Sequence, residues 1–514
     1  MCVRRRVTCT LLPRAFARCA LVEHSRQRFY IAPHGGEALR RITRGLRQLT
    51  SGARPATAAL LTAATLAACA SAPPAAPIEP SQTLAEFSAR RLDAVAGLPA
   101  PASGWDRSQW FTAALQLNPH LAEQRADVAA VAAAERTAAE YPNPSMELFA
   151  EYLKSAAESS AWLYGVSLDF LLRRPGERAR ARQQAALQTA LAQSELSESI
   201  WEVRAALRQA LLDVVAVQEE AGLLRALVAD RQALLDSDRK RLRLGDIGRA
   251  QLLSDELELA HAQQREQQMR ARGMDARARL AAAVGVPVAA LSGVPVRWED
   301  WAAIDTLSAV TPERWRTDAL IGRPQIVGAL RAYDLAEINL QGEVAKRWPQ
   351  LRIQPAYAWG GNGVRQDALD PIASESALGV SFELPLFNQH QGAIGEAVGR
   401  RTAAGEHLKA VQAQIYEQID RAELAWPTAQ QAWAEMQKLA ATAAAQQQAQ
   451  QRALALGASD RSELLAAQIA ATEAQLSLLE AAYTAEVAFA ALEDAYRRPL
   501  EGAESRWPTE PSHS

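Results

Sequence analysis

The sequence predicts a mainly α-helical chain with a membrane β-barrel part. Three observations carry this prediction. A very long helical hairpin occurs twice, a pair of strands precedes each hairpin, and every strand is apolar on one face. The elements follow the same order in both halves of the 514-residue chain, as expected after an internal duplication.

The first hairpin spans residues 176–285 and contains no proline, so nothing in it forces a helix to break. At 1.5 Å per residue, the 69 residues 175–243 predict a rod of roughly 100 Å. In the second hairpin, the long arm 392–456 contains Pro427, which predicts a kink. Apolar residues recur every seven positions in the first arm, which is typical of coiled-coil packing. They are Leu207, Val214, Ala221, Val228, Leu235 and Leu242.

Two shorter helical patterns, residues 108–140 and 248–284, contain 33 and 37 residues. Their predicted lengths are roughly 50 and 55 Å. Stacked end to end, they match the one long helix. The sequence therefore predicts a layer of rods in which two short helices lie beside each long one.

The second half repeats the landmarks of the first half at offsets of 205 to 214 residues. The offset changes within loops, as expected for duplicated units. The corresponding segments are Asn118-Pro119 with Arg323-Pro324, Gly165-Val166-Ser167-Leu168 with Gly379-Val380-Ser381-Phe382, and Leu244-Gly245 with Leu456-Gly457.

A candidate secretory signal lies near the start. Four arginines between residues 40 and 47 precede the apolar, small-residue run 56–68, an arrangement typical of such signals. The ending Leu66-Ala67-Ala68-Cys69 resembles a bacterial lipobox, which implies cleavage before Cys69 and lipid attachment to its thiol. A buried alanine-rich helix is the alternative, but a proline-rich segment follows at once.

Cleavage at this point changes the charge and the cysteine count. Residues 1–68 carry 12 Arg, 2 Glu and three of the four cysteines. The remainder has a net charge near −12 and one cysteine, so it forms no internal disulfide. This charge argues against nucleic acid and suits a cationic partner or cargo, although a solvated surface explains it equally well. The body of the chain has no apolar run of about 20 residues, so no transmembrane helix is expected there.

The strands predict a barrel shared between copies. They alternate in polarity over about ten residues, which is typical of transmembrane strands. Four strands cannot close a barrel, and lipid does not tolerate open sheet edges. A soluble sandwich is the alternative, but it is not expected beside rods of roughly 100 Å. The predicted lumen residues are Glu147, Glu151, Asp169 and Glu383, and the predicted lipid-facing aromatic girdle is Trp162, Tyr164, Phe170, Tyr357 and Trp359.

The chain resembles the outer-membrane efflux proteins of the TolC family over residues 108–499. The resemblance implies a homotrimer in which twelve strands close one barrel and the long hairpins form an α-barrel across the periplasm, with segment 286–312 in a belt around it. Two segments resemble members that serve heavy-metal exporters of the cobalt–zinc–cadmium type more than drug pumps. The matching residues are Cys69, Tyr141-Pro142-Asn143-Pro144, Glu383-Leu384-Pro385-Leu386-Phe387-Asn388, Leu244-Gly245 and Leu456-Gly457.

In such proteins the helical turns form the periplasmic aperture and contact a membrane-fusion (adaptor) protein. By position, these turns are residues 243–251 and 455–464. Three copies would surround the opening with the carboxylates of Asp246 and Asp460, which attract cations. Ordinary polar turn residues are the alternative. The predicted aperture and adaptor-contact residues are Arg243, Gly245, Asp246, Arg249, Gly457, Asp460 and Arg461.

No catalytic, cofactor or metal site is predicted. The seven histidines show no His-x-His or His-Glu-x-x-His spacing. There is no Gly-x-x-x-x-Gly-Lys phosphate loop and no Gly-x-Ser-x-Gly elbow. The energy for transport must therefore come from a partner.

We expect a passive, lipid-anchored exit duct in the outer membrane that meets an inner-membrane pump of the proton-driven RND type through an adaptor. A periplasmic coiled-coil lipoprotein, either an adaptor or an envelope spacer, is the alternative. Two hairpins, each with its own strand pair, favour the duct. The predicted segments are an extension and signal at 1–68, a tether at 69–105, repeats at 106–285 and 313–498, a linker at 286–312, strands at 145–154, 161–170, 351–359 and 377–384, and a tail at 499–514.

Overall fold

The chain divides into two compact units, Met1–Glu79 and Pro80–Ser514. The fold below is that of the second unit. The predicted signal, Cys69 and the loop tips between the paired strands lie outside the described residues. The computed structural model describes residues 77–153, 161–298, 301, 303–304, 312–360 and 374–500.

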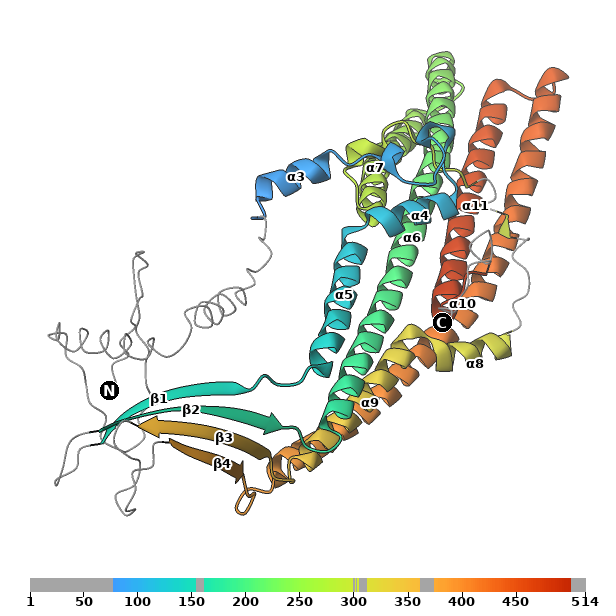
Figure 1. The fold of residues 1–514 in the computed structure, drawn as a ribbon. Helices are drawn as coiled ribbons and strands as arrows, with labels where there is room; N and C mark the ends of the chain where they lie inside the picture. The colour runs from blue at the N-terminus through green and yellow to red at the C-terminus, as the bar shows by residue number, and fades with distance from the viewer. Residues whose placement is uncertain are drawn as a thin grey trace, which may run out of the picture. The chain divides into compact units, whose positions relative to one another are not determined.

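The second unit repeats one plan twice (Figure 1). In each repeat two short helices lead to two strands, a very long helix and a return helix. The first repeat contains α4 (Arg107–Leu117), α5 (Pro119–Ala139), β1 (Ser145–Leu153), β2 (Ala161–Leu172), α6 (Glu177–Leu244) and α7 (Arg249–Val284). The second contains α8 (Pro312–Gly322), α9 (Pro324–Ala345), β3 (Leu351–Gly360), β4 (Ser374–Phe382), α10 (Gln391–Ala455) and α11 (Arg461–Tyr496). Outside this plan lie α3 (Pro80–Ser88) and the short 3-10 turns η1 (Leu92–Ala94), η2 (Pro101–Ser103) and η3 (Val288–Leu291).

The two predicted long arms are confirmed as α6, with 68 residues, and α10, with 65 residues. The seven-residue stripe of α6 packs inward, because Leu207, Val214 and Leu235 are buried and the other three members are half-buried. α10 continues through Pro427 as one helix. None of the helices in the described ranges combines the length and the apolar content that crossing a bilayer requires.

Each return helix meets a short helix end to end, as the sequence predicts. Asn118 caps α5 with its side chain, and its Nδ2 donates to the carbonyl of Ala283 in the last turn of α7 at 2.8 Å. In the second repeat, Nη1 of Arg323 donates to the carbonyl of Ala495 in the last turn of α11 at 3.1 Å. The residues before the two prolines therefore occupy equivalent joints.

The prediction of one helix over 108–140 is wrong, because the helix breaks at Asn118. Asn118 is extended, with φ −65° and ψ 121°, and Pro119 begins a new helix. Proline at the first helical position lacks only an N–H that would have no helical partner, and it disfavours the helical conformation in the residue before it. α5 has 21 residues, so the stacked pair falls short of α6. α4 instead packs against α6 and α7.

A buried ion cluster joins α6 to α11 near the middle of α6. Glu493 is fully buried and accepts from Arg204 Nη2 at 3.2 Å and from Arg208 Nη1. Its other oxygen accepts from the Leu500 N–H at 2.6 Å. Removing one member would leave a buried charge without its partner, which is strongly destabilising. This cluster therefore fixes how the second repeat packs against the first.

The four strands form one antiparallel sheet in the order β1-β2-β3-β4. β2 and β3 join the two repeats, with Tyr164 opposite Trp359. Within the described residues, β1 and β4 each have a strand on one side only. Three strands match the predicted ranges to within two residues. The fourth begins at Ser374 and ends at Phe382, so it starts and ends earlier than predicted.

Candidate membrane sheet and hairpin turns

One face of the sheet is apolar across all four strands. The register aligns the even-numbered residues of β1, β2 and β4 with the odd-numbered residues of β3. Side chains on alternate positions share a face. An exposed apolar patch of this extent marks a membrane or protein contact. Its exposed large side chains are Met146, Leu148, Tyr152, Trp162, Phe170, Leu172, Leu351, Tyr357, Leu378, Val380 and Phe382.

Four of the five predicted girdle residues lie together at the end of the sheet away from the helices. The ring centroids of Trp162 and Tyr164 are 6.2 Å apart, and those of Tyr164 and Trp359 are 6.4 Å apart. Tyr357 joins them at 5.8 Å from Trp359. The fifth, Phe170, lies near the helical end of β2. The aromatic residues therefore divide between the two ends of the apolar face, as in a membrane strand.

Tyr152 belongs to the same aromatic cluster, although the sequence did not single it out. Its ring centroid lies 5.1 Å from that of Trp162, directly across the β1–β2 pair. The alternation of β1 already placed Tyr152 on the apolar face, so this signal was present in the sequence.

The opposite face carries mostly small, polar and charged side chains, including the predicted lumen residues Glu147, Glu151 and Asp169. Leu153, Leu163 and Leu171 also lie on this face. Asp169 is paired, because Arg352 Nη1 lies 2.7 Å from its Oδ2. The prediction that Glu383 lies on the polar face of the fourth strand is corrected by the structure. Glu383 follows the last residue of β4, Phe382, so it lies beyond the strand rather than on its polar face.

Phe149 lies on this polar face directly opposite Gly165. Its ring occupies the space that a side chain at Gly165 would need, since a Cβ there would lie 2.1 Å from the ring Cζ. Only glycine allows this close approach. The Phe149 ring therefore lies directly against the backbone of Gly165.

The two hairpin turns share one backbone design. Gly245 and Gly457 have left-handed φ angles of +82° and +73°, which glycine adopts without strain. The Asp246 N–H donates to the Arg241 carbonyl at 2.9 Å, and the Ala458 N–H makes the equivalent 2.9 Å bond to Ala453. These are Schellman-type helix ends. Both turns lie at the ends of the long helices away from the strands (Figure 1).

The side chains of the two turns differ in what they do. Asp460 caps α11, because its carboxylate accepts from the Glu463 N–H at 2.8 Å. Its position 212 residues earlier is Gly248, which makes no side-chain cap. Asp246 is exposed in the loop, as are Arg243 and Arg249 of the same turn. Arg461, the first residue of α11, is exposed as well.

A buried pair of carboxyl groups lies near the first turn, and the sequence did not predict it. Asp238 of α6 and Asp255 of α7 are both buried and are hydrogen-bonded to each other. Burial, and then the hydrogen bond with Asp238, raise the pKa of Asp255. Gln251 donates to Asp255 at 3.2 Å, and Arg241 lies 3.3 Å from Asp238. Asp255 therefore holds its proton more tightly than an exposed aspartate would.

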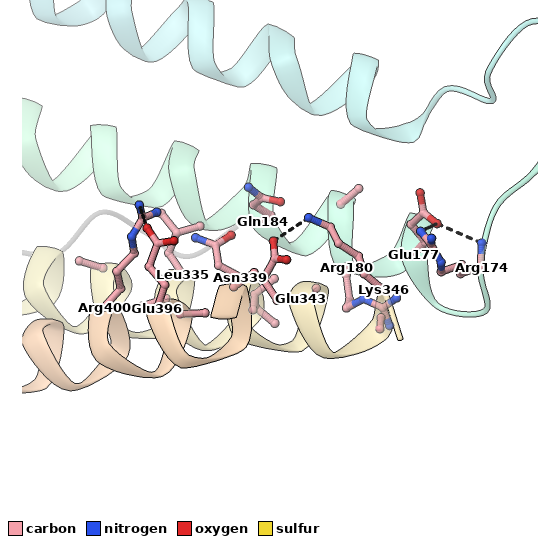
Figure 2. A pocket seen from close by; sticks show the side chains of 18 residues that line it. Arg174, Glu177, Arg180, Gln184, Leu335, Asn339, Glu343, Lys346, Glu396 and Arg400 are labelled. Carbon is pink, nitrogen blue, oxygen red and sulfur yellow. Dashed lines mark hydrogen bonds and ion pairs between the residues drawn. The ribbon is translucent and has the colours of Figure 1, made fainter. Parts of the chain in front are cut away.

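A cavity of about 620 Å³ lies between α6, α9 and α10, close to the strands (Figure 2). Charged side chains of both signs line it, and most of them are paired with a charge three or four residues away in the chain. Lys346 Nζ lies 2.6 Å from Glu343 on α9, and Arg174 lies 3.9 Å from Glu177 at the start of α6. The paired charges make this cavity polar without a strong net charge. Among the described residues, no group of three or more His, Cys, Asp or Glu side chains could hold a metal ion.

No protein-family model matches the chain, and no curated protein sequence matches it. Solved structures do match it, and their reported subjects are membrane proteins. The MtrE outer-membrane channel of Neisseria gonorrhoeae, described in its open state, is 17% identical with a TM-score of 0.61, over 76% of this chain and 88% of that one.

Two further matches are similar. The outer-membrane protein VceC of Vibrio cholerae is 14% identical with a TM-score of 0.61, over 77% of this chain and 97% of that one. The CmeC outer-membrane channel of Campylobacter jejuni is 12% identical with a TM-score of 0.60, over 83% and 93%. The chain has the fold of these outer-membrane channels.

Proposed function

We propose that this protein is the outer-membrane channel of a tripartite efflux system, through which substrates leave passively. The observation that carries the proposal is the sheet. One of its faces is apolar, with exposed large side chains on all four strands, and within the described residues both of its edges are open. A bilayer covers such a face, but it does not tolerate the edges. The shared fold with outer-membrane channels supports the same function.

The open edges require further copies of the chain. β1 of one copy would pair with β4 of the next, and three copies would close twelve strands into one barrel. The polar face, with Glu147, Glu151 and the Asp169–Arg352 pair, would then line a water-filled lumen. This homotrimer agrees with the resemblance to the TolC family.

The turns at the far ends of the long helices are the proposed contact with a periplasmic adaptor. Exposed Arg243, Asp246 and Arg249 in the first turn, and Arg461 in the second, offer charged groups for that contact. An inner-membrane pump of the proton-driven RND type would supply the energy. Lipid attachment at Cys69 would anchor the chain to the same membrane, which mass spectrometry of the peptide that begins at Cys69 would test.

Swelling of liposomes that contain the purified full-length protein tests the channel. We expect solute uptake, a trimer in detergent, and gel migration that changes on boiling, as membrane barrels show. Reversing the charge at Arg243 and Arg249 should change the uptake if the turns form the aperture. A monomer without pore activity, whose migration does not change on boiling, would instead fit a periplasmic adaptor or spacer.

A further inference from the structure

The apolar face of the sheet ends sharply where the strands meet the helices. Leu172, Leu351 and Phe382 lie opposite one another in register and form its last row. Beyond this row, four short junctions connect the strands to α5, α6, α9 and α10. If the sheet spans a membrane, these junctions lie at the membrane surface on the helical side.

The junctions expose large aromatic side chains. Tyr141 is 70% exposed, Trp348 71% and Phe387 99%. All three lie within five residues of a strand end, next to the last row of the apolar face. Aromatic residues are enriched where a membrane protein passes from hydrocarbon to water. The junctions are therefore suited to the region of the lipid head groups.

Three arginines of the same junctions have no carboxylate partner among the described residues. They are Arg173, which directly follows β2, Arg178 in the first turn of α6, and Arg347 before β3. Arg178 Nη1 donates to the Tyr141 hydroxyl at 3.0 Å, and the guanidinium lies 4.4 Å from the ring centroid. The neighbouring cations differ, because Arg174 and Lys346 are paired with Glu177 and Glu343.

We propose that these residues form a basic–aromatic belt that binds the phosphate groups of anionic phospholipids. The belt consists of Tyr141, Arg173, Arg178, Arg347, Trp348 and Phe387. The planar guanidinium of arginine matches phosphate oxygens in a bidentate way, and the rings pack among the acyl chains next to the head groups. The proposal rests on the proposed membrane position of the sheet.

Insertion of the purified full-length protein into vesicles tests the belt. One set of vesicles contains phosphatidylcholine alone, and the other contains phosphatidylcholine with a minor share of phosphatidylglycerol. We expect insertion into both, with a higher yield at limiting lipid when phosphatidylglycerol is present. Added salt should reduce this gain, because it screens exposed charges beyond about 10 Å, and should leave insertion into phosphatidylcholine unchanged.

The variant R173Q/R347Q should lose most of the gain. An arginine at an anionic membrane surface contributes about fivefold in partitioning, so the loss for two is about 25-fold. The matched control is R225Q/R277Q. It removes the same charge from exposed positions on α6 and α7 and should keep the gain. R173K/R347K keeps the charge and should retain most of it, which guards against a folding defect in the glutamine variant.

Equal insertion of the wild-type protein into both kinds of vesicle would overturn the belt but not the channel. An equal loss in R225Q/R277Q would also overturn it, because the attraction would then be general. A second copy could instead cover Phe387. In that case F387S would reduce the fraction of trimer in detergent. The belt instead predicts an intact trimer and weaker insertion into both kinds of vesicle. Failure to insert into any vesicle would reject the channel itself.

Discussion

The two long helices hold equivalent places in the repeat but have different surroundings. α6 packs against α5, α7, α9 and α11, and 19 of its 68 residues are buried. α10 packs against α8, α9 and α11, and seven of its 65 residues are buried. Tyr416, Leu424 and Leu439 remain exposed along α10. The duplicated sequence has therefore produced one interior helix and one edge helix.

The edges of the helical layer coincide with the edges of the sheet. α10 directly follows β4, one open strand, and α5 directly precedes β1, the other. α5 has a single buried residue within its bounds, Leu121. A second copy placed beside α10 would therefore cover an open helix side and an open strand together. This agreement favours assembly side by side, with each copy using its second repeat against the first repeat of its neighbour.

The largest expected effect contrasts a buried leucine of α6 with an exposed leucine of α10. Leu211 of α6 is 1% exposed and Leu424 of α10 is 72% exposed. Leu211→Ala should destabilise the chain by about 3 kcal/mol, because it leaves a cavity in the core. Leu424→Ala should change the stability of the isolated chain by less than about 0.5 kcal/mol. Denaturant unfolding of the detergent-solubilised monomer measures both, and equal losses would remove the distinction between interior and edge.

The two strand glycines give the next contrast. Gly165→Ala should destabilise the sheet by about 1–3 kcal/mol, because the added methyl group collides with Phe149. The duplicated position is Gly379, where a Cβ would have its nearest neighbour at 3.4 Å. Gly379→Ala should therefore be tolerated.

The double variant G165A/F149A identifies the cause of this loss. Removing the ring should restore part of the stability, measured as the fraction of folded protein that resists unfolding in detergent. If G165A and G379A were equally damaging, the Phe149 contact would not explain the requirement for glycine.

The two turn glycines should behave alike. Gly245→Ala and Gly457→Ala should each cost about 1–2 kcal/mol, because alanine is strained at a positive φ. At Gly222 in the interior of α6, an added Cβ would have no neighbouring atom within 4 Å outside its own helix turn. Gly222→Ala should therefore stabilise by about 0.5–1 kcal/mol. Thermal unfolding followed by circular dichroism measures all three, and a large difference between the two turns would contradict their common design.

The smallest expected effect depends on pH and belongs to the first repeat alone. The positions that correspond to Asp238 and Asp255 in the second repeat are Gln450 and Ala467. The folded chain holds the Asp255 proton more tightly than the unfolded chain, because burial and the Asp238 hydrogen bond raise its pKa. Stability should therefore fall as the pH rises through the range between the unfolded value, about 3.9, and the raised value.

Asp255→Asn should remove this loss. The variant should be more stable than the wild-type protein at neutral pH, and the difference should vanish below the unfolded pKa. Asp236→Asn, at an exposed neighbour, is the control and should show no such dependence. Unfolding midpoints measured across the pH range would refute the raised pKa of Asp255 if the two variants behaved alike.

The sequence predicted the features that depend on the periodicity of a single helix or strand. It missed the contacts that depend on how two elements pair. Alternation alone assigned Trp162, Tyr164 and Tyr357 to one face, since each strand shows its own period. The contacts of Asp169 with Arg352 and of Phe149 with Gly165 require the register between strands. Likewise, Asp238 and Asp255 look like solvated helix residues until the rotation of α6 against α7 is known. The sequence already contained the break at Asn118, in the proline that follows it.

The joint between α5 and α7 has a mechanical consequence. The two helices meet at the Asn118–Ala283 hydrogen bond without a covalent link between them at that point, whereas α6 runs beside both as one continuous helix. A rotation of α7 about its own axis need not turn α5, but any torsion of α6 is carried along its full length. Displacements that begin at the turns can therefore be absorbed at the joints of the paired helices.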